Sequence, residues 1–426
     1  MPLGRPHHGM SKTRIAALIY LCGMVALHVA LFWNEWPLVR KGYSDFTIYY
    51  SAATMVRRGL GHQLYNDVAQ FKVQREFAPD VPIRQSALPF NHPPFEALLF
   101  VPFTYLSYVP AFVSWDLVNL GILSAIPFLV RRHVPELQDY AWPLWILASL
   151  SFFPIFFALL QGQDSILLLL LYTLAFVSLK KNAEALAGGF LALGLFKPHL
   201  ILPFVFLWAL RSGKKILYGF LATAAALALV SLGIVGIRGL VSYPSYVFHL
   251  EKTMAGGAIK PSEMPNLRGM IHVLADNHSY VGVITILLSC SILVVAAMLC
   301  RSREAAPDLF DWKFSLAIVT SIFVSYHCLG YDLSVLLLPI ALIIVILSYP
   351  DTLNRWPRTL IFSGVAILFF SPLHLALIVH HAALMGWAVF LLLTGIVVQI
   401  WLQIQNSASA SANRQSLAAS GPPEIR

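Results

Sequence analysis

Asp45 is the residue of this sequence that is best placed for acid–base chemistry. It stands directly before residues at the i, i+3, i+4 and i+7 positions of one helical face, namely Phe46, Tyr49, Tyr50 and Ala53. We expect this helix to lie along a boundary between water and lipid and to end at Gly59. The positive end of the helix macrodipole favours an ionised carboxylate at Asp45. Asp45 therefore either caps the helix or acts as a general base, which takes a proton from a reacting hydroxyl.

A second polar group lies in residues 91–96, which contain two successive prolines. Proline fixes the approach of the backbone, and we expect Asn91 and His92 to face the same side as Asp45. His92 and Glu96 are one helical turn apart. They either form a hydrogen-bonded pair or contact a substrate.

Polar residues also interrupt two apolar runs, at Gln163 and at Lys197. Polar and charged groups in apolar surroundings are costly and often functional. Lys197 and the nearby His199 could contact a phosphate. Alternatively, Lys197 extends its amine toward the interface or marks a kink.

Two later segments supply further candidates. Arg268 carries a fork of donors that suits phosphate or carboxylate. His327 and Asp332 flank a glycine between two apolar runs, and His327 is expected on the same face as Asp45. A single histidine is often structural, so binding and structural roles both stay open here.

The elements that position these residues follow from composition. The chain has 426 residues, of which 58% are hydrophobic and 12% charged, and its mean hydropathy is +0.72. Such a chain is a polytopic membrane protein, and its spanning elements must be α-helices because lipid offers the backbone no hydrogen bonds. The net charge of +9 comes from lysines and arginines at the ends of apolar runs, as orientation signals do. Nucleic acid is therefore not an expected partner. The four cysteines have no paired spacing that would indicate a disulfide framework or a zinc site.

We expect an all-α bundle of about 12 transmembrane helices, since each span needs about 20 apolar residues. The bundle covers residues 15–404, with outer loops at 34–92 and 238–280. Residues 1–14 form a cytoplasmic N-terminal tail, and residues 405–426 form a polar cytoplasmic tail that we expect to be disordered.

Two stretches leave the topology open. Residues 93–107 are short and flanked by proline, and residues 185–210 are broken near Lys197. Either the first crosses the membrane and the second is a single helix, or the first is a re-entrant hairpin and the second is two short helices that meet at Lys197. The second arrangement is favoured because it places two pairs of basic residues inside.

The ordered motifs resemble glycosyltransferase family 87, which comprises membrane enzymes of the GT-C type. The similarity extends from about residue 15 to about residue 347. The motifs that carry it are Asp45-Phe46, Tyr49-Tyr50, Ala52-Ala53, Gly59, Leu64-Tyr65, Asn91-His92-Pro93-Pro94-Phe95, Gly162-Gln163, Lys197-Pro198, Asn266-Leu267-Arg268-Gly269 and Tyr331-Asp332.

The resemblance implies a polyprenyl-phosphate sugar donor, an acceptor on the outer face of the membrane, and inversion at the anomeric carbon. It gives Asp45 the role of catalytic base and places His327 at the donor phosphate. The residues expected to contact the substrates are His327, Lys197, Arg268, His92, Asn91, Tyr49, Gln163 and Asp332. Mannose is the expected sugar because the best-known family member transfers it. No cofactor is indicated, nor is a divalent metal, because no second acidic residue stands beside Asp45.

The expected protein is thus a multi-pass enzyme of a bacterial plasma membrane, in contact with membrane lipids and with a glycolipid or glycan acceptor. A transporter or lipid flippase would use the same charged groups along a route that reaches both faces. A non-catalytic scaffold of envelope assembly would tolerate the loss of Asp45, Lys197 and His327.

Overall fold

The protein is seen in a computed structural model. It describes residues 12–79, 88–134, 137–138, 141–254, 261–275, 280–302, 309–347, 354–380 and 382–419.

The described residues contain helices and connections but no strand. The first part of the chain forms α1 (Lys12–Arg40), α2 (Phe46–Arg57), α3 (Asp67–Phe77), α4 (Glu96–Phe100), α5 (Tyr108–Val130), α6 (Trp142–Ser151), α7 (Phe153–Gln161), α8 (Ser165–Lys180) and α9 (Glu184–Leu193). The second part forms α10 (Pro198–Ser212), α11 (Lys214–Met254), α12 (Leu267–Leu274), α13 (Val281–Arg301), α14 (Leu309–Val324), α15 (Leu337–Leu347), α16 (Arg355–Phe369), α17 (Ser371–Val379) and α18 (Met385–Ala419). The predicted all-α membrane fold is therefore confirmed.

Among the described helices, five are long and apolar enough to cross a membrane, or up to seven if each of two bent pairs counts as one span. The bent pairs are α6 with α7 and α16 with α17. Several further apolar helices have only 10–17 residues. The predicted total of about 12 spans of roughly 20 residues each therefore stays a prediction.

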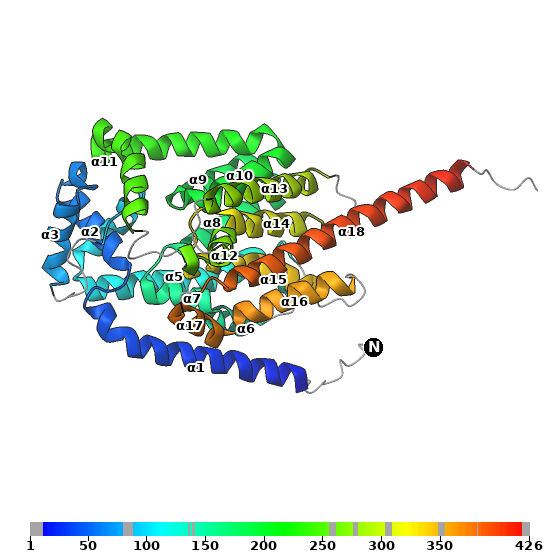
Figure 1. The fold of residues 1–426 in the computed structure, drawn as a ribbon, viewed down its shortest axis with the longest axis horizontal. Helices are drawn as coiled ribbons and strands as arrows, with labels where there is room; N and C mark the ends of the chain where they lie inside the picture. Colours follow the sequence, from blue (N-terminus) through cyan, green and yellow to red (C-terminus); the bar gives the residue numbers. More distant parts are fainter. Residues whose placement is uncertain are drawn as a thin grey trace, which may run out of the picture.

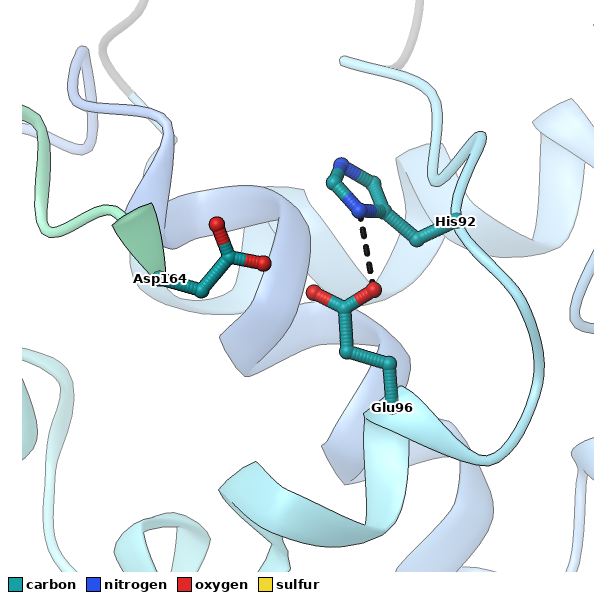
Figure 2. Close-up of side chains that lie close together, drawn as sticks. All are labelled: His92, Glu96 and Asp164. Carbon is teal, nitrogen blue, oxygen red and sulfur yellow. Dashed lines mark ion pairs between the residues drawn. The ribbon is translucent and has the colours of Figure 1, made fainter. Parts of the chain in front are cut away.

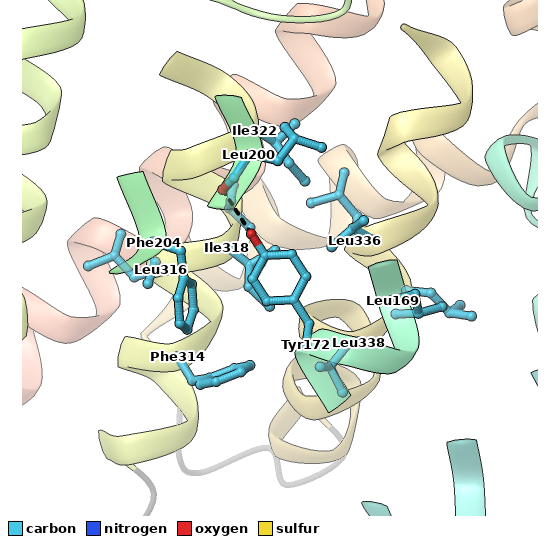
Figure 3. Packing of buried hydrophobic residues seen from close by; sticks show 14 of the residues in the cluster. Leu169, Tyr172, Leu200, Phe204, Phe314, Leu316, Ile318, Ile322, Leu336 and Leu338 are labelled. Carbon is cyan, nitrogen blue, oxygen red and sulfur yellow. Dashed lines mark hydrogen bonds between the residues drawn. The ribbon is translucent and has the colours of Figure 1, made fainter. Parts of the chain in front are cut away.

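The centre of the bundle is built by α8, α10, α14 and α15, and Figure 3 shows part of it. The ring of Tyr172 lies against Phe204, which in turn contacts Phe314, and the hydroxyl of Tyr172 donates to the Leu200 carbonyl at 2.8 Å. Lipid tails are as apolar as such a core, so close van der Waals packing and internal hydrogen bonds must hold these helices together.

The structure shows which helices the two ambiguous stretches, residues 93–107 and 185–210, form. Residues 96–105 form α4 and a short 3₁₀ helix before α5 begins, which together are half the length of a span. The second stretch is α9 and α10, which meet at Lys197 as the favoured arrangement predicts. Pro198 stands at the start of α10, where its missing N–H costs nothing.

The predicted outer loops are largely helical and lie against each other (Figure 1). Gly236 has a φ of +69° and bends α11, so that its second half runs down toward α2 and α3. There the hydroxyl of Tyr246 donates to Asp67 at 2.8 Å. These helices form one cap at the end of the bundle opposite the start of α1.

One expectation for α2 is wrong. The helix begins and ends as predicted, and Gly59 follows it with a φ of +73°. However, Phe46, Tyr49 and Tyr50 are buried against other parts of the chain and do not face lipid headgroups. An amphipathic pattern marks a face that needs an apolar partner, and here that partner is protein.

At the chain ends, residues 1–11 and 420–426 lie outside the described residues. Residues 405–419, for which the sequence predicts disorder, continue α18 as a helix.

Candidate active site

A cavity of about 390 Å³ lies where the cap meets the bundle. Its walls come from the start of α2, residues 88–92, the α7–α8 junction, the α9–α10 break, the second half of α11, and residues 326–332. Of the predicted site residues, Asp45, Asn91, His92, Gln163, Lys197, Arg268, His327 and Asp332 line it. Tyr49 does not, but its hydroxyl donates to Oε1 of Gln163 at 2.7 Å, one contact behind the wall.

A larger space of about 830 Å³ lies elsewhere, between α1, α5, α6, α15, α16 and α17. Its walls are almost entirely apolar, with Arg131 the charged residue among them. It suits a hydrocarbon chain. The chemistry therefore belongs to the smaller cavity, where charged and polar side chains converge.

Asp45 is half-buried in the cavity wall and does not cap α2 through its side chain. Its Oδ2 atom instead accepts a hydrogen bond from Nε2 of Gln163 at 2.8 Å. Its backbone N–H donates to Oε1 of Gln161 at 3.1 Å. The carboxylate is therefore held in place by the turn after α7.

That turn depends on Gly162, which ends α7 in the left-handed region at φ +62°. A Cβ atom there would come within 2.8 Å of Cβ of Phe46 and 2.9 Å of Cε2 of Phe112. The indole N–H of Trp115 donates to the Gly162 carbonyl at 3.1 Å. Glycine thus permits both the backbone conformation and the close approach of α2.

Lys197 is buried at the α9–α10 break. Its ammonium donates to Oδ1 of Asp332 and to Oγ of Ser165, both at 2.6 Å, and pairs with Oδ1 of Asp164 at 2.8 Å. These three partners match its three N–H donors. Lys197 therefore does not reach an interface, as one alternative had it, and its protons are already used.

Arg268 and His327 come from later segments of the chain and line the same cavity. The guanidinium of Arg268 stacks over the Tyr326 ring at 3.9 Å and donates to the Tyr326 carbonyl at 3.0 Å. The rings of His199 and His327 meet edge to face at 5.8 Å. Asn266 joins this region together, because its amide donates to the Ser325 carbonyl at 2.8 Å while its Oδ1 caps α12.

His92 lines the cavity and forms a cluster with Glu96 and Asp164, which do not line it (Figure 2). Nδ1 of His92 lies 2.9 Å from Oε2 of Glu96 without a hydrogen bond between them, so the two side chains are neighbours but do not form the hydrogen-bonded pair of the first alternative. Burial lowers the pKa of His92 from 6.5 to about 4, so its imidazole is neutral at pH 7.

Asp164 and Ser165 were not predicted as site residues, whereas Glu96 and His199 were considered beside His92 and Lys197 but were not counted among the expected substrate contacts. One signal could have found Asp164, because it directly follows Gln163. The predicted absence of a metal rested on the sequence around Asp45 alone, whereas this cluster comes from other segments.

Comparison with known families identifies one match. A model described as glycosyltransferase family 87 covers residues 90–325, more than half of the chain. No curated protein and no solved structure matches the chain. The matched range includes His92, Gln163, Lys197 and Arg268, while Asp45 and Asp332 lie outside it.

Proposed function

Because the chain belongs to glycosyltransferase family 87, we propose that it moves a hexose from a polyprenyl-phosphate donor to a glycolipid or glycan acceptor on the outer face of a bacterial plasma membrane. Family membership itself makes it a membrane glycosyltransferase, in agreement with its apolar helices. Mannose is the sugar proposed.

The observation that supports the proposal most strongly is the Asp45 carboxylate in the cavity wall, oriented by Gln163. In the proposed step, an acceptor hydroxyl oxygen attacks the anomeric carbon while Asp45 takes the hydroxyl proton. The bond from the anomeric carbon to the phosphate oxygen breaks, and its electron pair leaves with the phosphate. Attack from the side opposite the leaving group inverts the anomeric carbon. A positioned base typically contributes about 10²–10⁴-fold to such a step.

The leaving phosphate needs positive charge or hydrogen-bond donors nearby. Arg268 and His327 line the same cavity as Asp45 and supply both kinds of group. Lys197 takes a different role from the one expected, because its donors are held by Asp164, Ser165 and Asp332. We assign it to positioning those side chains.

A transporter or flippase is the alternative, and it would need polar groups along a route to both faces. The predicted residues other than Tyr49 instead line one cavity, and the larger space has almost no polar lining. This arrangement favours an enzyme.

The test uses membranes that contain the protein, incubated with labelled polyprenyl-phosphate-mannose or polyprenyl-phosphate-glucose. We expect label in a glycolipid or glycan product from the mannose donor. Asp67→Asn serves as the matched control for Asp45→Asn, since Asp67 is an exposed acid of the cap outside the cavity. Label carried across sealed vesicles without transfer would favour the transporter.

A further inference from the structure

His92, Glu96 and Asp164 come from three places, the end of the first predicted loop, the start of α4 and the start of α8. One ligand atom from each lies within 4.8 Å of the others. Figure 2 shows the three side chains turned toward a common point. An imidazole nitrogen and two carboxylates are a ligand set typical of divalent cations.

Several buried polar atoms at this point make no hydrogen bond. Glu96 is 2% exposed, and neither of its carboxylate oxygens accepts a hydrogen bond. Nδ1 of His92 also makes none, although it lies 2.9 Å from Glu96. Buried carboxylate oxygens without donors are costly. Such atoms are expected where a cation completes the site.

The charges near this cluster also favour a bound cation. Glu96, Asp164 and Asp332 are all buried carboxylates, and Lys197 is the buried cation that contacts two of them. Ionised, the three acids and one ammonium leave an excess of two negative charges. Lys197 pairs with Oδ1 of Asp164, and Oδ2 of Asp164 makes no hydrogen bond. One divalent cation would neutralise the excess.

We propose that His92, Glu96 and Asp164 bind one divalent cation, of the class of Mn²⁺ or Mg²⁺, behind His92 at the edge of the cavity that Asp45 lines. Oxygen-rich ligand sets suit these ions, and three protein ligands leave coordination positions open for water or phosphate oxygens. The cation would supply a positive charge to the phosphate of an anionic substrate. Cation binding does not depend on the proposed sugar transfer, since it needs neither donor nor acceptor.

The test is a titration of the full-length protein in detergent, stripped with a chelator, with Mn²⁺ alone. Free Mn²⁺ is counted by its electron paramagnetic resonance signal. We expect one saturable site in the wild type and at least a tenfold weaker one in Glu96→Gln and Asp164→Asn, because even outer-shell partners of metal sites change affinity by about 10–100-fold. Asp116→Asn is the matched control, since Asp116 is also a buried acid with an unpartnered oxygen but lies outside the cluster.

Two further readouts separate metal binding from misfolding. Mn²⁺ should raise the melting temperature of the wild type and of Asp116→Asn, but not that of Glu96→Gln. Pulsed resonance should detect coupling to an imidazole nitrogen that disappears in His92→Gln. Wild-type protein that takes up no Mn²⁺ at millimolar concentration would overturn the proposal, as would unchanged binding in Glu96→Gln and Asp164→Asn or the absence of nitrogen coupling.

Discussion

Nε2 of Gln163 donates a hydrogen bond to Oδ2 of Asp45 at 2.8 Å, although the two residues are 118 positions apart. Tyr49, one turn after Asp45, donates to Oε1 of the same amide at 2.7 Å. The amide of Gln163 is therefore fixed from both sides, and with it the direction of the Asp45 carboxylate.

Replacing Gln163 with alanine should lower kcat for sugar transfer by about 10²-fold, because a misplacement of about 1 Å costs that much in a positioned reaction. The KM for the donor should change far less, since Asp45 remains present and charged. Steady-state kinetics in detergent measure both. Gln63→Ala is the control, as Gln63 lies in the cap outside the cavity. An unchanged kcat in Gln163→Ala would show that Asp45 needs no such support.

Replacing Lys197 with methionine should destabilise the protein by about 3–5 kcal/mol, because it leaves Asp164 and Asp332 buried without their cation. Adding Asp332→Asn removes one of these buried, uncompensated charges and should restore part of the loss. Thermal unfolding of both variants in detergent tests this. If Lys197→Met melts like the wild type, the ammonium does not hold the two aspartates.

Replacing Gly162 with alanine should cost about 1–2 kcal/mol for the left-handed backbone alone. The added Cβ would also press on Phe46 and Phe112, at 2.8 and 2.9 Å. We expect a lower melting temperature together with lower activity, because Gln163 is the next residue. Gly121→Ala is the control, since a Cβ there meets nothing within 4 Å. Equal melting temperatures for the two variants would contradict the requirement for glycine.

Local features of the fold could be predicted from the sequence. The helix after Asp45 follows from spacing and Gly59, and the break at Lys197 follows from Pro198. The burial of α2 could not be predicted, because the same amphipathic pattern fits a lipid surface and a protein partner.

The site was predicted as a set of residues but not as a set of contacts. The cavity brings together segments that carry the motifs named in the sequence. That Lys197 contacts Asp332, 135 positions away, depends on how the 3₁₀ helix of residues 330–336 packs against α7 and α8. No spacing in the sequence contains that information, so Lys197 was expected to have its amine available for phosphate.

The most direct measurement is sugar transfer and donor binding on the same purified Asp45→Asn protein. Asparagine keeps nearly the same shape and can still contact Gln163, but it cannot accept the hydroxyl proton. We predict that labelled polyprenyl-phosphate-mannose binds with affinity close to that of the wild type while transfer falls by about 10²–10⁴-fold. Transfer at the wild-type rate by Asp45→Asn would contradict the assignment of Asp45 as the general base.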